Sequence, residues 1–309
     1  MKTVVILLSD KRSGSTMFQD ALCTHPKVQT VEYSPHTYLE THHWLKAAVL
    51  LNIHPSLFSN SKMYKNYGSR KNARIYLESE LKGNLPDYEI PKDDKQLVFE
   101  GWEALCDRFA QPIFFEKSPQ HIAHWAALSL LLEWAQQTKK YKVKIIGLVR
   151  NPLAVQYSAF KLFRSLPTQR QYGWLNMHKN LLACKSLLRE EQFQLIQYED
   201  IVDTPETTLT EICNFIGVVY DPVMAQKIHG NSKTKWNDDP YFTLILDPSV
   251  TQMANTFGYS ASVLVNINTN KISTWELFVW NIDTLFNKLK NRILNRFVLP
   301  ILLKLKLKK

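Results

Sequence analysis

Four short runs of apolar residues, rich in β-branched side chains, recur along the 309-residue chain. They cover residues 3–8, 112–116, 143–149 and 193–197. Short runs rich in apolar residues are typical of strands buried inside a parallel sheet. Longer segments with helical period lie between them, at 15–24, 35–51, 70–82, 97–109, 119–138, 152–164, 172–190 and 205–216. This alternation predicts an α/β protein in which helices cover both faces of a parallel sheet.

The pattern also divides the chain into one large domain and a C-terminal extension. We predict the domain over residues 1–259. Residues 52–94 are polar and contain no candidate for a buried strand, so we interpret them as an insertion over one edge of the sheet. Residues 260–309 are predicted to form a linker followed by a basic amphipathic helical tail.

The formal net charge of +10 is concentrated in the tail. Residues 288–309 contain eight Lys and Arg residues and no Asp or Glu, which leaves the rest of the chain close to neutral. This distribution argues against a duplex-binding face on the domain, and no nucleic-acid partner is expected.

Apolar residues recur every four positions in the same tail, from Leu289 to Leu305. A basic amphipathic helix of this kind fits an anionic membrane interface, and we predict such contact through residues 274–309. The alternative is a terminal helix that docks on the domain.

Neither the cysteines nor the N-terminus indicates export. The four cysteines show no C-x-x-C spacing, and the N-terminal apolar run is five residues long, too short for a signal peptide. No segment reaches the roughly 20 apolar residues of a membrane-spanning helix. We therefore expect a cytoplasmic protein, with peripheral contact to the inner membrane face through the tail.

The stretch "SDKRSGST" that follows the first strand predicts an anion-binding turn. Gly14 lies among Ser13, Ser15 and Thr16 just before a helix, where backbone N–H groups would point into one concavity. The Walker pattern G-x-x-x-x-G-K-[ST] is absent, which disfavours a nucleoside-triphosphate enzyme. The alternative is an ordinary strand-to-helix turn capped by a hydroxyl group.

A second candidate site follows the strand at 143–149. Arg150 comes at the carboxyl end of that strand, where open α/β sheets bind their ligands. Ser158 lies two turns into the next helix and can face the same crevice.

The loop "RSGST", the motif "EKSP" and the motif "VRNP" with Ser158 eight residues after Arg150 resemble the sulfotransferase family. That family uses 3′-phosphoadenosine 5′-phosphosulfate (PAPS). The segment "QLIQYEDIVDTPETTLTEICNFIGVVYDP" is similar to a stretch seen in many bacterial members. The resemblance runs from residue 3 to about residue 258 and is strongest to bacterial proteins of the carbohydrate and tyrosylprotein branch. It implies a P-loop-type sheet and a sulfotransferase activity.

The resemblance implies which residues bind the PAPS co-substrate. The loop residues match the cradle of the 5′-phosphosulfate: Arg12, Ser13, Gly14, Ser15 and Thr16. Arg150 and Ser158 match the pair that holds the 3′-phosphate. A late polar loop adds four candidates for the 3′-phosphate or the adenine: Ser232, Lys233, Lys235 and Trp236. No metal is expected, because a sulfuryl group carries less negative charge than a phosphoryl group.

The resemblance also implies catalytic residues. Arg12 and Lys117 are the candidates for offsetting charge on the leaving phosphate. Two carboxylates compete as the base: Glu116 matches the "EKSP" glutamate, and Glu32 matches the acidic residue that follows an "HP" turn. We favour Glu32 because of its "HP" context and its offset of 20 residues from Arg12.

Six histidines do not match a catalytic pattern of the family, and we interpret them as helix-surface or core residues: His25, His36, His42, His43, His121 and His124. The predicted reaction is sulfuryl transfer to a hydroxyl or amine of a carbohydrate, a glycolipid or another small acceptor. Two alternatives remain, a nucleotide-dependent phosphotransferase and a catalytically silent module that binds nucleotide or lipid.

Overall fold

The computed structural model describes residues 2–53, 69–163, 165–230, 232–240 and 242–268, and the single residues 282, 285, 286 and 289. The predicted tail therefore lies outside the described residues apart from those four positions. None of the described helices combines the length and the apolar character that crossing a bilayer requires.

Within the described residues, five strands form one parallel sheet in the order β2-β3-β1-β4-β5. The strands are β1 (Thr3–Ser9), β2 (Val28–Gln29), β3 (Ile113–Lys117), β4 (Lys142–Val149) and β5 (Phe193–Gln197). The four predicted strands and the α/β class are confirmed. The edge strand β2 was not predicted, because two residues leave no recognisable apolar run.

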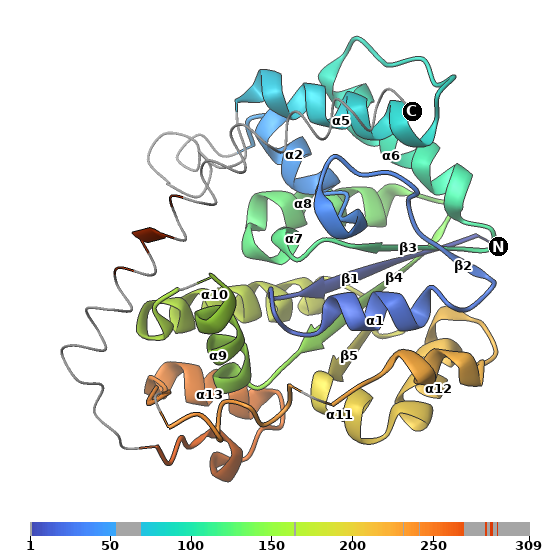
Figure 1. Cartoon of the computed structure of the whole chain (residues 1–309). Helices are drawn as coiled ribbons and strands as arrows, with labels where there is room; N and C mark the ends of the chain where they lie inside the picture. The colour runs from blue at the N-terminus through green and yellow to red at the C-terminus, as the bar shows by residue number, and fades with distance from the viewer. Residues whose placement is uncertain are drawn as a thin grey trace.

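Helices cover both faces of this sheet (Figure 1). They are α1 (Ser15–Leu22), α2 (His43–Leu50), α5 (Arg70–Asn84), α6 (Asp94–Phe109), α7 (Gln120–Ala123), α8 (Trp125–Gln137), α9 (Pro152–Phe163), α10 (Pro167–Ser186), α11 (Tyr198–Asp203), α12 (Pro205–Ile216) and α13 (Pro248–Thr256). Short 3₁₀ turns add η1 (Thr37–Leu39), η2 (Glu190–Gln192), η3 (Pro222–Lys227) and η4 (Ala261–Leu264). Helices α1, α11 and α12 pack on one face, and most of the others pack on the opposite face.

Strand β1 shows why both faces need a helical cover. Successive side chains of a strand point to opposite faces, so Val4, Ile6 and Leu8 enter one core and Val5 and Leu7 enter the other. All five are fully buried. Each buried aliphatic side chain contributes about 1.5–3 kcal/mol relative to an exposed one, so the continuous apolar run secures the strand at the centre of the sheet.

The predicted insertion contributes to a core where it is described. Ala73 and Leu77 of α5 are buried in the same apolar cluster as α2. The first part of that stretch, residues 54–68, lies outside the described residues. The assignment of residues 52–94 as an insertion stays a prediction.

Three predicted helices differ most clearly from the structure. The helix expected at 35–51 is replaced by η1, an irregular stretch and α2, because Tyr38, Leu39 and His42 adopt left-handed backbone conformations. The helix expected at 119–138 is broken by the extended backbone of His124. The helix expected at 172–190 begins earlier, at Pro167, and ends at Ser186.

Candidate active site

The loop between β1 and α1 forms an open helix N-terminus. Gly14 adopts φ 90° and ψ 11°, and a Cβ atom at this position would lie 2.4 Å from the ring of Tyr198. Only glycine fits both the left-handed backbone and this close approach. Among the described residues, no side chain caps α1, so its first N–H groups have no intrahelical or capping partner. The loop therefore has the features of an anion-binding turn.

The carboxyl ends of β1 and β4 bring Arg12 and Arg150 to one edge of the sheet. The Arg150 guanidinium donates a hydrogen bond of 3.0 Å to the carbonyl oxygen of Arg12, across the gap between β1 and β4. Arg12 Nε donates to Ser158 Oγ at 3.0 Å, which joins α9 to the loop. Ligands of open α/β sheets bind at this edge, and Arg12, Arg150 and Ser158 lie together there.

Arg150 is buried and keeps one N–H donor without a hydrogen-bond partner among the described residues. Its guanidinium lies 4.1 Å from the centroid of the Tyr198 ring and donates to Ser232 Oγ at 3.2 Å. Burial lowers the pKa of Arg150, although the group stays charged. In the part of the chain that the structure describes, its Nε has no hydrogen-bond partner. A buried arginine with an unused donor fits an anionic group such as a phosphate.

Of the four candidates in the late polar loop, all within the described residues, Ser232 accepts a hydrogen bond from Arg150, whereas Lys233, Lys235 and Trp236 do not. Ser232 contacts both Arg150 and, at 3.1 Å, the hydroxyl of Tyr198. Lys233 forms an ion pair with Asp203 and, with Trp236, lines a cavity of about 520 Å³ that Asn151 also borders. Lys235 is exposed and does not line this cavity.

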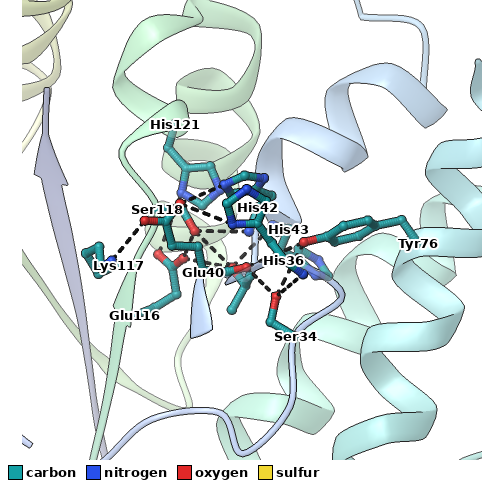
Figure 2. Close-up of polar contacts among 11 residues, drawn as sticks. Ser34, His36, Glu40, His42, His43, Tyr76, Glu116, Lys117, Ser118 and His121 are labelled. Atoms are coloured by element: carbon teal, nitrogen blue, oxygen red, sulfur yellow. Dashed lines mark hydrogen bonds and ion pairs between the residues drawn. The ribbon is translucent and has the colours of Figure 1, made fainter. Parts of the chain in front are cut away.

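At the other side of the loop, Lys117 ends β3 next to the end of β1. Its side chain is buried, and its Nζ lies 2.9 Å from Oε1 of Glu40. Oε2 of Glu40 lies 3.0 Å from His42 Nε2 and 3.6 Å from His36 Nδ1 (Figure 2). Glu40 was not among the predicted site residues.

The charges around Glu40 determine its ionisation. Burial alone would raise the pKa of Glu40, but the hydrogen bond from His42 and the Lys117 ammonium group outweigh burial and lower that pKa to about 2. The carboxylate is therefore ionised at neutral pH. Burial lowers the pKa of His42 to about 4, so that imidazole is neutral at the same pH.

Glu116 is buried next to Lys117 in the same strand. Its Oε1 accepts hydrogen bonds from Thr41 Oγ1, at 2.7 Å, and from Ser118 Oγ. Its Oε2 lies 3.6 Å from Nδ1 of the fully buried His121. Burial raises the pKa of Glu116 to about 7, so the protonated form is strongly populated near neutrality.

Glu32 lies outside this cluster. Its side chain is 69% exposed and pairs with Arg108 at 3.3 Å. The structure thus brings Glu116 and Lys117 together with Glu40 and leaves Glu32 on the surface.

The histidines divide into two groups. His25 Nε2 donates a hydrogen bond to the carbonyl oxygen of Val219. His43 Nε2 donates to the carbonyl oxygen of Val98, and its Nδ1 lies 3.2 Å from Glu80. His36 and His42 instead contact Glu40, at the end of the segment that precedes α2. Nothing in the residue pattern distinguishes these two groups.

The elevated pKa of Glu116 predicts a pH-dependent stability. The folded state holds this proton more tightly than the unfolded chain does, so the free energy of unfolding should fall as the pH rises from 4.5 to about 7. One group of this kind contributes up to about 3 kcal/mol to the free energy of unfolding.

We expect Glu116→Gln to flatten the decline, because its amide keeps an acceptor for Thr41 and Ser118 without titrating. Urea denaturation from pH 4.5 to pH 7.5 measures this, with the exposed Glu32→Gln as the control. An unchanged slope in Glu116→Gln would contradict the assignment.

Comparison with known proteins identifies the family. The family model described as "Sulfotransferase family" matches residues 5–222. The match spans more than half of the chain, so the protein belongs to the sulfotransferase family, as its motifs predict. A comparison with curated proteins gives no match.

Solved structures with similar folds include two sulfotransferase domains. The domain from the Synechococcus PCC 7002 olefin synthase is 23% identical, with a TM-score of 0.58, and the alignment covers 84% of this chain and 95% of that domain. The domain from the curacin biosynthetic pathway is 19% identical, with a TM-score of 0.54, over 84% of this chain and 99% of the other. These likenesses establish the fold.

Proposed function

We propose that the protein transfers the sulfuryl group of PAPS to a hydroxyl or amine of a carbohydrate, a glycolipid or another small acceptor. The observation that carries this proposal is the group of Arg12, Arg150, Ser158 and Ser232 beside the uncapped N-terminus of α1. Two anion-binding places on one edge of a sheet suit a nucleotide that has phosphates at both its 3′ and 5′ positions.

The co-substrate would lie across the carboxyl ends of β1, β4 and β5. Loop residues 12–16 would hold the 5′-phosphosulfate through backbone N–H groups. Arg150, Ser158 and Ser232 would hold the 3′-phosphate, for which the unused Nε of Arg150 is available among the described residues. Lys233 and Trp236 border the cavity next to Asn151, where the adenine would have room.

The reaction would be an in-line displacement at sulfur. The acceptor oxygen or nitrogen forms a bond to sulfur as the bond from sulfur to the 5′-phosphate oxygen breaks, and the acceptor proton passes to a base. Negative charge develops on the departing phosphate. Arg12 and Lys117 would offset this charge from two neighbouring strands, which is the largest contribution expected from the protein.

We assign the base to Glu40 in place of Glu32 or Glu116. A base must come within hydrogen-bond reach of the proton that it accepts, and geometry is decided before pKa. Glu40 is ionised and lies 2.9 Å from Lys117, so it belongs to the same side of the site. Glu116 is fully enclosed, and the Glu32 carboxylate is paired with Arg108 on the surface.

The predicted insertion is proposed to shape the acceptor pocket. Tyr76 of α5 lies parallel to the His42 ring, with centroids 6.4 Å apart. The ring of Tyr38 is exposed and lies 6.0 Å from Lys117 Nζ. An acceptor approaching Lys117 would meet these side chains first. Contact of the tail with an anionic membrane, on the cytoplasmic side, remains part of this proposal and would favour lipid-linked acceptors.

The test uses the full chain, PAPS and a panel of sugars, phenols, amines and glycolipids, with release of 3′-phosphoadenosine 5′-phosphate (PAP) as the readout. We expect acceptor-dependent PAP release that falls about 100- to 10,000-fold in Glu40→Gln, because a positioned base contributes that much. The matched variant Glu32→Gln should keep its activity. Turnover of ATP instead of PAPS would overturn the proposed reaction. Loss of activity in Glu32→Gln alone would overturn the assignment of the base.

A further inference from the structure

The side chains of His36, Glu40 and His42 converge in a way that the proposed transfer does not require. His36 Nδ1, Glu40 Oε2 and His42 Nε2 all lie within 4.8 Å of one another (Figure 2). The distance from Glu40 Oε2 is 3.6 Å to His36 and 3.0 Å to His42. The two imidazole rings have their centroids 4.2 Å apart.

The 3.0 Å separation between Glu40 Oε2 and His42 Nε2 matches that of two atoms bound to one transition-metal ion, and the 3.6 Å separation between Glu40 Oε2 and His36 Nδ1 is slightly longer. Nitrogen and oxygen ligands lie about 2.1 Å from Zn²⁺, so neighbouring ligands at octahedral to tetrahedral angles lie about 3.0–3.4 Å apart. Two imidazoles and one carboxylate form a common set for zinc and for similar first-row ions. Small side-chain rotations of the half-exposed His36 would complete the convergence.

The two oxygens of the Glu40 carboxylate face different partners. Glu40 Oε1 accepts from Lys117, while Oε2 faces the two histidines. An ion at Oε2 therefore does not displace Lys117. A ligating carboxylate whose second oxygen is held by a hydrogen bond is oriented in advance, which is a usual feature of protein metal sites.

The cluster of His36, Glu40 and His42 is exposed to solvent at His36 and packed against Tyr76 at His42. The His36 side chain is 40% exposed, whereas those of Glu40 and His42 are 10% and 3% exposed. Solvent or a further ligand can reach an ion from the His36 side, and the Tyr76 ring packs parallel to His42. Three protein ligands with one open position are typical of accessible zinc sites.

We propose that His36, Glu40 and His42 form a binding site for Zn²⁺ or a similar first-row divalent ion. A bound ion would occupy the Glu40 oxygen that faces away from Lys117, so zinc should inhibit transfer. This inhibition rests on the proposed function of Glu40, whereas ion binding does not.

The experiment titrates the chelator-treated full chain with Zn²⁺ by calorimetry and with Co²⁺ by visible absorbance. We expect one equivalent of Zn²⁺ to bind with a Kd in the micromolar range or below. His36→Ala should weaken binding at least about tenfold, since even outer-shell changes at metal sites cost 10- to 100-fold. The exposed His229 lies in another part of the chain, and His229→Ala should bind as the unaltered protein does.

Thermal unfolding of His36→Ala and of a second variant, His36→Asn, measures whether the fold survives the substitution. We expect both variants to keep the stability of the unaltered protein, because His36 is at the surface.

Absence of zinc binding in the unaltered protein, or equal binding by the His36 and His229 variants, would overturn the site. Zinc binding by a protein that does not turn over PAPS would leave the site standing and remove only the proposed function. Inhibition of turnover by Mg²⁺ at the concentration at which Zn²⁺ inhibits would contradict an imidazole site.

Discussion

Lys117→Met should lower kcat about 1,000-fold, because removing one preorganised donor to a developing negative charge costs about 100- to 1,000-fold and Lys117 supplies a full charge. The Lys117 Nζ is buried at the end of β3, beside the loop that would hold the sulfuryl group. Affinity for PAP should change far less, since the charge is needed most in the transition state. Steady-state kinetics with PAPS and a responsive acceptor, together with PAP titrations, separate these two effects.

The matched control for this variant is Lys142→Met. Lys142 begins β4 at the opposite end of the sheet and is exposed, so kcat should stay unchanged. If Lys117→Met retains kcat but loses stability, the lysine serves only as the ion-pair partner of Glu40. That result would exclude the proposed charge stabilisation.

Arg150→Ala should weaken PAP binding about 100-fold, since a charge-assisted contact with phosphate is among the strongest polar interactions and the substitution also removes a hydrogen bond to Ser232 Oγ. Adenosine 5′-phosphosulfate lacks the 3′-phosphate. Its affinity should therefore change much less in Arg150→Ala than that of PAP. Competition titrations with the two nucleotides measure the difference.

The control for Arg150 is Arg170→Ala. Arg170 lies partly buried near the loop, where it pairs with Asp10 at 2.8 Å, but it does not contact Ser158 or Ser232 in the described residues. We expect Arg170→Ala to affect stability more than nucleotide selectivity. Equal losses of PAP and adenosine 5′-phosphosulfate in Arg150→Ala would contradict a 3′-phosphate role and place Arg150 among the structural residues.

The sheet could be predicted because its strands are buried on both faces. In β1 and β4 nearly every residue enters a core, so the sequence shows short, predominantly apolar runs that are rich in β-branched residues. The short edge strand β2 gives no such signal. Gly14 and Arg150 could be located because both directly follow or end these strands, and strand ends define the ligand edge.

Glu40 could not be predicted, and the backbone of its segment explains why. The periodicity of residues 35–51 is helical and predicts a helix that would include Glu40. The left-handed conformations of Tyr38, Leu39 and His42 interrupt that helix, although none of the three is a glycine or an asparagine. Tertiary contacts, such as that of His42 N–H with Ser118 Oγ at 3.0 Å, hold the segment in place. Such contacts join residues far apart in sequence, which local patterns do not encode.

Glu32 illustrates the opposite case. Its sequence context matches the family, but the chain after β2 leads the side chain to the surface, where Arg108 pairs with it. A motif fixes the identity of a residue and not the path of the backbone beyond it. The two carboxylates are only eight residues apart, so a small difference in path decides which one reaches Lys117.

Calorimetric titration of the unaltered protein with PAP, with ATP as the comparison, tests the central claim most directly. The constellation of Arg12, Arg150, Ser158 and Ser232 beside the α1 N-terminus predicts stoichiometric PAP binding in the micromolar range or tighter, with ATP at least about tenfold weaker because it lacks a 3′-phosphate. No binding of PAP, or a preference for ATP, would contradict the account.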